Sequence, residues 1–137
     1  KEPVGTLART AGRGLSLLLV EDDPTVADVI AGLLRALGHD VTHVPHGLAA
    51  LSEVADTRFD MALLDLDLPG ITGMALASQL RAGGFAAPLV AVTARADAEA
   101  EPLAREAGFD AFLRKPVTAA MLGAAIDSLR TEVADGR

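Results

Sequence analysis

The sequence contains no cysteine, no tryptophan and no tyrosine, and it has only four phenylalanines among its 137 residues. The absence of cysteine excludes disulfides, thiolate metal sites and cysteine nucleophiles. The scarcity of aromatic rings argues against stacking surfaces for single-stranded nucleic acid or for sugars. No apolar run approaches the ~20 residues that span a bilayer, and residues 1–14 lack the apolar core of a signal peptide. The sequence therefore predicts a cytoplasmic protein without direct membrane contact.

Positive charge is also scarce, because 12 basic residues stand against 19 acidic ones and the net charge is −7. An acidic chain without a basic stripe predicts that nucleic acid is not a partner. Half of the residues are apolar and 23% are charged, which supports one buried core rather than a disordered tail. The only lysines are Lys1 and Lys115, which raises the question of what arginine could not do at position 115.

Regular patterning begins at Leu15. Residues 1–14 contain proline and three glycines without apolar periodicity, so we expect a linker or tail there and a single domain over residues 15–137. Within this domain, short apolar runs alternate with segments whose apolar residues recur at helical spacing. The expected strands are 15–20, 41–44, 61–64, 89–92 and 111–113. The expected helices are 24–37, 48–55, 73–82, 98–107 and 118–133.

This alternation predicts an α/β fold with a parallel five-stranded sheet, right-handed crossovers and helices on both faces. The strand segments that are runs of Leu, Val and Met lack alternating polar residues, as expected for strands buried on both sides. Asp23 is a candidate N-cap ahead of Pro24, a residue suited to the first position of a helix. Thr118 is a candidate cap of the last helix.

Polar residues of particular kinds follow four of the expected strands. The first strand is followed by Glu21 and Asp22, the third by Asp65, the fourth by Thr93 and the fifth by Lys115. Open α/β sheets place their binding sites beyond the carboxyl ends of the strands. Core packing does not require this set of side chains, so we expect a functional site at that edge.

The residue types at this edge indicate phosphate chemistry. Converging carboxylates repel one another, and a divalent cation relieves the repulsion. Oxygen ligands without nearby His or Cys favour Mg²⁺ over Zn²⁺. Mg²⁺ keeps open positions for phosphate oxygens, so the pattern predicts phosphoryl transfer with a carboxylate beside the metal as nucleophile. Lys115 then offers a mobile ammonium to a phosphate oxygen, and Thr93 offers a hydroxyl.

Four sequence segments also occur in the order and at the spacing of a known family. They are LLLVEDDP (17–24), LLDLDLPGITG (63–73), VAVTA (90–94) and FLRKP (112–116). With these motifs the chain resembles the receiver (response-regulator, CheY-like) domains of bacterial two-component systems. The resemblance implies a flavodoxin-like, three-layer, doubly wound (βα)5 fold with strand order 2-1-3-4-5. It also implies a phosphorelay role, Mg²⁺ as cofactor, and a histidine kinase or histidine phosphotransfer domain as partner.

The resemblance assigns roles to the acidic residues. Asp65 matches the phosphoacceptor. Glu21 and Asp22 match the acidic pair, with Asp22 binding Mg²⁺ directly and Glu21 acting through water. Asp67 matches the position whose backbone carbonyl binds the metal, so the implied metal site comprises Glu21, Asp22, Asp65 and Asp67.

The resemblance also implies a conformational switch. Thr93 matches the switch hydroxyl, and Lys115 matches the lysine that senses the phosphate, at a Lys115–Pro116 bond that is usually cis in the family. Phe112 stands where the switch aromatic is more often tyrosine, so it can rotate inward but has no hydroxyl. With Arg114, it lies on the face where receivers dock their partners.

Several expectations concern residues around this site and the wider protein. Asp67 and Arg95 flank the site, and an ion pair between them across its mouth is one expectation. His39, His43 and His46 are interpreted as a solvent-facing strand edge and loop, rather than as a metal site or a phosphodonor. The chain is expected to be a monomer or weak dimer. It is either a free-standing regulator or the C-terminal receiver of a hybrid, membrane-bound sensor histidine kinase.

Two other functions remain open at this stage. The Asp65-x-Asp67 motif is compatible with a small phosphatase of the haloacid-dehalogenase type, although there the acidic pair follows the motif instead of preceding it. A pseudo-receiver would keep the fold as a docking module without accepting phosphate. Turnover of a phosphomonoester distinguishes the phosphatase, and labelling by acetyl phosphate distinguishes the pseudo-receiver.

Overall fold

The computed structural model describes the backbone of residues 14–135 and the side chains through residue 130. Most of the linker or tail expected at residues 1–14 therefore lies outside the described residues. The strands are β1 (Ser16–Val20), β2 (Asp40–Val44), β3 (Met61–Asp65), β4 (Leu89–Thr93) and β5 (Ala111–Arg114). The helices are α2 (Pro24–Ala36), α3 (Gly47–Asp56), α4 (Gly73–Ala82), α5 (Ala100–Ala107) and α6 (Ala119–Asp135). Each expected element is present, with ends displaced by at most two residues.

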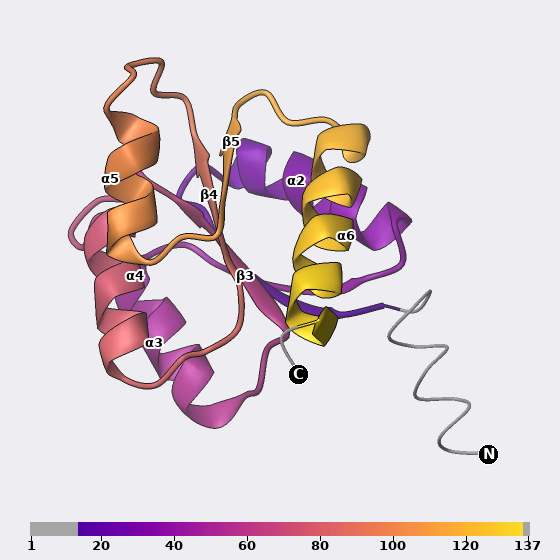
Figure 1. Ribbon diagram of the computed structural model, residues 1–137, viewed down its shortest axis with the longest axis horizontal. Coiled ribbons are helices and arrows are strands. Elements are labelled where there is room, and N and C mark those ends of the chain that lie inside the picture. The colour runs from indigo at the N-terminus through magenta and orange to yellow at the C-terminus, as the bar shows by residue number, and fades with distance from the viewer. Residues whose placement is uncertain (1–13, 136–137) are drawn as a thin grey trace.

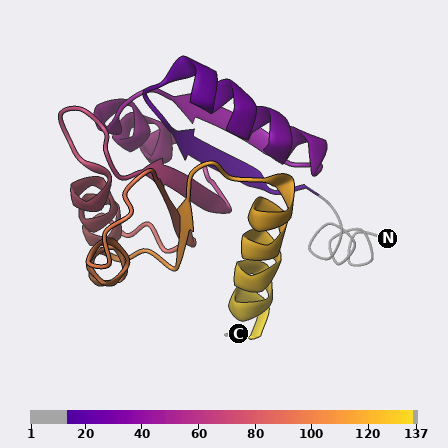
Figure 2. The same cartoon turned by 90° about the horizontal axis from the view of Figure 1, so that it is seen from above.

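The five strands form one sheet in the order β2-β1-β3-β4-β5, and all neighbouring pairs are parallel. Helices α2 and α6 cover one face of the sheet, and α3, α4 and α5 cover the other (Figure 1). Figure 2 shows the same three layers from above. This arrangement confirms the flavodoxin-like fold and the strand order that the sequence implied. The chain reverses direction across the sheet between β1 and β3, so the carboxyl ends of these two strands flank the expected crevice.

The core has two halves because successive strand residues point to opposite faces. On β1, Leu17 and Leu19 pack with α2 and α6, while Leu18 and Val20 pack with the three helices on the other face. These four side chains are at most 1% exposed. Burying an aliphatic side chain of this size contributes about 1.5–3 kcal/mol. The central strands β1, β3 and β4 are therefore apolar except at their ends, whereas the edge strand β2 carries Thr42 and His43.

Side-chain caps determine where several helices begin. The Thr25 and Val26 N–H groups donate to Asp23 Oδ1, and Pro24 is the first residue of α2, as predicted. At α6, the Met121 N–H donates to Thr118 Oγ1, which confirms the second predicted cap. None of the helices within the described residues is long and apolar enough to cross a membrane.

The three histidines correct one sequence interpretation. His39 is buried, at 9% exposure, and its Nδ1 accepts a hydrogen bond from the Leu15 N–H. The prediction that all three face solvent is therefore wrong for His39, because this ring satisfies a backbone donor at the start of β1. His43 contacts the Glu21 carbonyl through Nε2 at 2.8 Å, and His46 caps α3 by accepting from the Ala49 N–H. Each ring thus has a local structural role.

Candidate functional site

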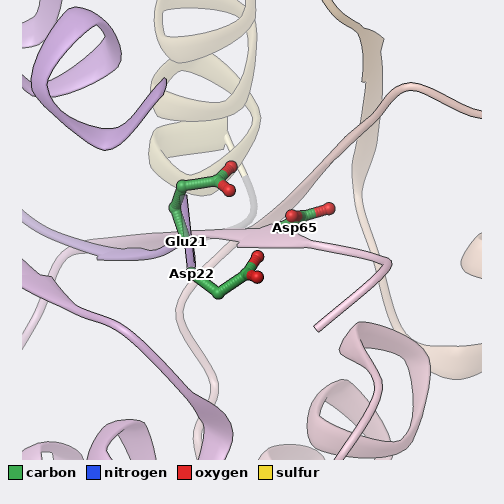
Figure 3. A group of neighbouring side chains, drawn as sticks. All are labelled: Glu21, Asp22 and Asp65. Atoms are coloured by element: carbon green, nitrogen blue, oxygen red, sulfur yellow. The ribbon is translucent and has the colours of Figure 1, made fainter. Parts of the chain in front are cut away.

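The carboxyl ends of β1 and β3 bring three acidic side chains together. Val20 pairs with Leu64 in the sheet, so Glu21 and Asp22, which follow β1, lie beside Asp65 at the end of β3. One carboxylate oxygen from each acid lies within 4.8 Å of the others, and Figure 3 shows the three groups directed toward a common space. Glu21 is 2% exposed and Asp65 5% exposed, whereas Asp22 is open to solvent. The sequence expectation that these acids converge is met.

The loop after Asp65 is held tightly against the end of β3. The Asp67 N–H donates to Asp65 Oδ1 at 3.0 Å, and the Gly73 N–H donates to the Leu66 carbonyl at 3.0 Å. A Cβ atom on Gly73 would lie 2.3 Å from the Asp65 carbonyl oxygen. Only glycine fits this close approach, and the sequence analysis did not identify that role. Gly73 is the last residue of the LLDLDLPGITG motif, and its place there could have indicated this role.

Lys115 follows the edge strand β5, and its side chain extends toward the acids at the ends of β1 and β3. Its Nζ donates to Glu21 Oε1 at 2.8 Å and lies 3.4 Å from Asp65 Oδ2. The Lys115 side chain is 19% exposed. The Lys115–Pro116 peptide bond that follows β5 is cis, as the family resemblance implied. Burial alone would lower the pKa of Lys115, but the Glu21 hydrogen bond and the Asp65 charge outweigh it and raise that pKa. The ammonium therefore remains charged.

Burial and the neighbouring charges also affect Glu21. Burial raises the pKa of this carboxyl, and the charge of Asp65 adds to the effect. Hydrogen bonds from Lys115 and from the Asp23 N–H act in the opposite direction and only partly offset it. A second cation would relieve the remaining repulsion. The donors are all oxygens, and two of the three acids are buried, so the cluster suits a hard divalent cation such as Mg²⁺.

Thr93 ends β4 and is completely buried. Its hydroxyl donates to Asp67 Oδ2 at 3.3 Å and accepts from the Arg95 N–H at 3.0 Å. The Asp67–Arg95 ion pair considered from the sequence is absent. The Arg95 guanidinium instead makes a two-pronged contact with Asp97, at 3.0 and 2.9 Å. Asp97 lies on the same loop and presents both carboxylate oxygens to the planar guanidinium. Two-pronged pairs of this kind are among the stronger hydrogen-bonded contacts.

Phe112 lies beside this loop and is partly buried against the core face that α3, α4 and α5 cover. The Arg114 guanidinium lies 4.9 Å from the centre of the Phe112 ring. It also donates to the carbonyls of Arg95 and Asp97, at 2.9 and 3.1 Å. One side chain thus connects β5 to the loop that follows Thr93. The sequence analysis placed Arg114 on this face but did not identify these contacts.

The sequence matches the response regulator receiver domain family over residues 17–127. This match covers most of the chain, and the chain belongs to that family: it is a receiver domain of two-component signalling. The family and fold predicted from the motifs are confirmed. The haloacid-dehalogenase interpretation is set aside, because residues 17–127 match the receiver domain family.

Among curated relatives, the chain is 39% identical over 120 residues to the sensory transduction protein RegX3 of Mycolicibacterium smegmatis, covering 88% of this chain and 52% of RegX3. It is 38% identical over 100 residues to the DNA-binding response regulator MtrA of the same organism, covering 73% of this chain and 43% of MtrA. The chain thus spans about half the length of the curated relatives it matches. Because MtrA is described as DNA-binding, the expectation of no nucleic-acid partner gains no support for the whole protein.

Solved receiver domains have the same fold. The receiver domain of the sensor histidine kinase PA1611 from Pseudomonas aeruginosa is 33% identical, with a TM-score of 0.79 and coverage of 86% of this chain and 98% of that one. That structure has a magnesium ion coordinated in its active-site cleft. A CheY-like receiver domain protein from Methanospirillum hungatei is 25% identical, with a TM-score of 0.83 and coverage of 90% and 99%.

Proposed function

We propose that Asp65 is a phosphoacceptor, which receives a phosphoryl group from a phosphohistidine on a histidine kinase or a histidine phosphotransfer domain. The observation that carries this proposal is the position of its nearly buried carboxylate, next to two further acids and 3.4 Å from the only lysine of the domain. Core packing has no need for three acids and an ammonium at one sheet edge. The family membership supports the same assignment.

The transfer exchanges one bond to phosphorus for another. An Asp65 carboxylate oxygen bonds to phosphorus while the P–N bond of the donor phosphohistidine breaks. The histidine nitrogen keeps the electron pair of that bond and takes up a proton from solvent. Lys115 is already held at Asp65, so its ammonium is positioned to bind an oxygen of the incoming group.

The acidic cluster fits Mg²⁺ as its cofactor. Glu21, Asp22 and Asp65 would hold the ion, and Asp67 would add its backbone carbonyl. When bound, Mg²⁺ neutralises charge on the phosphate oxygens and orients the transfer. The convergence of three carboxylate oxygens within 4.8 Å of one another supports a cation in this place. The magnesium ion in the similar PA1611 receiver domain supports the same choice.

Phosphorylation then changes the balance of contacts around the site. The new phosphoryl group places a dianion beside Lys115, and Thr93 ends the neighbouring strand β4. We expect the Thr93 hydroxyl to move toward it, and Phe112 to rotate into the space vacated. The outcome is a local change in charge that alters a docking surface some distance away.

The wider context remains a prediction. A DNA-binding regulator, a hybrid sensor kinase and a free-standing regulator would each contain such a receiver domain, and only in a hybrid kinase would the parent protein be an enzyme. MtrA, a relative of the first kind, is about 1.7 times as long as this chain, because 100 aligned residues make up 43% of it. The cytoplasmic location and the monomer or weak dimer expected from the sequence are likewise predictions.

The direct test is incubation with acetyl phosphate and Mg²⁺, followed by mass spectrometry of the intact protein. We expect one added phosphoryl group on the wild type, none on Asp65→Asn, and one on the control Asp28→Asn, which replaces an exposed aspartate of α2. Equal labelling of wild type and Asp65→Asn would refute the assignment of the acceptor. No labelling of the wild type would indicate a pseudo-receiver, and turnover of a generic phosphomonoester would indicate a phosphatase.

A further test concerns Lys115. Lys115→Ala is expected to accept phosphate from acetyl phosphate but to leave the docking surface in its resting conformation. Amide exchange of the loop that follows Thr93, measured before and after phosphorylation, reports that surface. A wild-type response in Lys115→Ala would contradict a sensing role for the lysine.

A further inference from the structure

We infer that the Asp67 side chain is a positioning residue, which holds the Thr93 hydroxyl in the resting protein and so restrains the switch. This inference rests on the proposed function and concerns the regulation of the same site. Its starting point is the hydrogen bond from Thr93 Oγ1 to Asp67 Oδ2, at 3.3 Å. The role implied for Asp67 by the family resemblance involves only its backbone carbonyl, so the carboxylate is otherwise unassigned.

The Thr93 hydroxyl has no spare hydrogen. Thr93 is completely buried, and its oxygen already accepts a hydrogen bond from the Arg95 N–H. A hydroxyl donates only one hydrogen bond, and here that bond goes to Asp67. Thr93 cannot donate to a phosphoryl oxygen on Asp65 until it releases the Asp67 carboxylate. The two acceptors therefore compete for one proton.

Two neighbouring contacts keep the Asp67 carboxylate paired with the Thr93 hydroxyl. Its own backbone N–H is fixed to Asp65 Oδ1, so the residue cannot leave the mouth of the site without losing that bond. The nearby cation, Arg95, is occupied by Asp97 on the same loop. Among the side chains described, through residue 130, Thr93 is the sole hydrogen-bonding partner of the Asp67 carboxylate.

Phosphorylation reverses this preference. The phosphoryl group adds a dianion to Asp65, whose Oδ1 accepts from the Asp67 backbone N–H. It also offers Thr93 an acceptor of greater charge, and charge-assisted hydrogen bonds are the stronger ones. The Asp67–Thr93 bond therefore stabilises the resting state and is lost in the phosphorylated one. Removing the acceptor at position 67 should make the switched conformation easier to reach.

Two substitutions at position 67 separate this role from a simple charge effect. Asp67→Ala removes both the negative charge and the acceptor. Asp67→Asn removes the charge but retains a side-chain oxygen that accepts from Thr93. If the hydrogen bond is responsible, Asn behaves more like the wild type than Ala does. If charge repulsion alone is responsible, Asn and Ala behave alike.

The experiment uses beryllofluoride with Mg²⁺ as a phosphoryl analogue and follows the Thr93 methyl signal by NMR. We expect about tenfold tighter beryllofluoride binding for Asp67→Ala, as the loss of one hydrogen bond to a charged acceptor implies. Without ligand, the Thr93 methyl shift of Asp67→Ala should move part of the way toward its ligand-saturated value. Asp67→Asn should stay closer to the wild type than Asp67→Ala does in both measurements, because its amide oxygen still accepts from Thr93.

A double-mutant cycle with Thr93→Val completes the design. Valine has nearly the same shape but no hydroxyl, so Asp67→Ala should change beryllofluoride affinity less than twofold in that background. Tightening that persists in Thr93→Val, or an equal effect of Asn and Ala, would overturn the inference. So would a wild-type methyl shift and affinity in Asp67→Ala, a result that needs no Thr93 variant. If the wild type itself fails to bind beryllofluoride, the proposed function fails and this inference falls with it.

Discussion

At the amino edge of the sheet the Arg81 guanidinium donates five hydrogen bonds, whereas at the carboxyl edge the Lys115 ammonium contacts two carboxylates. Four of the Arg81 bonds go to backbone carbonyls, those of Phe85, Ala87 and Gly108, and the fifth goes to Asp110. Asp110 also accepts from the Leu89 N–H at the start of β4. Each cation thus joins loops that are distant in sequence, but to different kinds of acceptor.

The difference predicts that the amino edge resists change and that the carboxyl edge can respond. Backbone carbonyls neither titrate nor receive phosphate, and a planar guanidinium with five directed donors fits only one arrangement of them. Carboxylates bind cations, protons or a phosphoryl group, and an ammonium on a flexible stem follows such changes. The amino edge is therefore a scaffold, and the carboxyl edge is where a chemical event can alter the structure.

The largest expected effect is at the rigid edge. Arg81→Ala removes the donors of three loop carbonyls and the partner of Asp110, and we expect a loss of about 2–3 kcal/mol of unfolding free energy. Urea denaturation measures it. Arg81→Lys keeps the charge but not the fork and should recover less than half of the loss. If Arg81→Lys had the unfolding free energy of the wild type, the positive charge rather than the guanidinium geometry would be what stabilises this edge.

A smaller loss is expected at the responsive edge. The Cβ atom of Gly73→Ala would lie 2.3 Å from the Asp65 carbonyl oxygen, so the loop must shift, at a cost of about 1–3 kcal/mol. Labelling of Asp65 by acetyl phosphate should also slow. The matched control is Gly32→Ala in α2, where a Cβ meets nothing within 4 Å, and it should stabilise the protein by about 0.5–1 kcal/mol. Equal effects of the two substitutions would contradict the close approach.

The amino edge should also show a pH dependence through His39. Burial lowers the pKa of this imidazole from its usual value of 6.5; the charge of Arg130 lowers it further, and that of Asp127 opposes the change. As the pH falls below about 6.5, the unfolded state takes up a proton that the folded state refuses, so stability falls, by up to about 1.4 kcal/mol per pH unit. His39→Asn, which offers an oxygen to the Leu15 N–H, should flatten this dependence between pH 5.5 and 7.5 in urea denaturation. An unchanged slope would rule out His39 as its source.

The smallest effect on stability is expected at Arg114. This side chain is exposed, so Arg114→Ala should cost less than about 1 kcal/mol through its contact with the Phe112 ring. Its carbonyl partners are those of Arg95 and Asp97, and amide exchange of that loop should accelerate. Arg58→Ala, which replaces an exposed arginine remote from this loop, serves as the control. Exchange that responds equally to both substitutions would mean that Arg114 does not restrain the loop.

Much of the fold could be predicted from local sequence because its signals lie within single elements. Apolar runs predicted the strands, helical spacing predicted the helices, and Asp23 and Thr118 predicted two caps that the structure contains. The edge that carries the site followed from the rule for parallel sheets. The family motifs added the strand order, which the alternation of elements alone leaves undetermined.

Side-chain pairing was less predictable, since it depends on which of several neighbours a group finds. Asp67 had both Arg95 and Thr93 within reach, and the structure pairs it with Thr93 because Asp97 engages the arginine. Likewise, His39 follows a glycine at the end of a helix, and nothing in that context indicates burial.

The amino-acid sequence by itself determined the kinds of element, their order, and the chemical groups that follow each strand, because those depend on periodicity and on the polarity of neighbours along the chain. Only the tertiary structure decided which groups meet. Lys115 and Glu21 are 94 residues apart, and Arg81 and Gly108 are 27 apart. Such contacts form when packed layers bring strand ends and loops together, and their geometry depends on the whole sheet rather than on any segment of it.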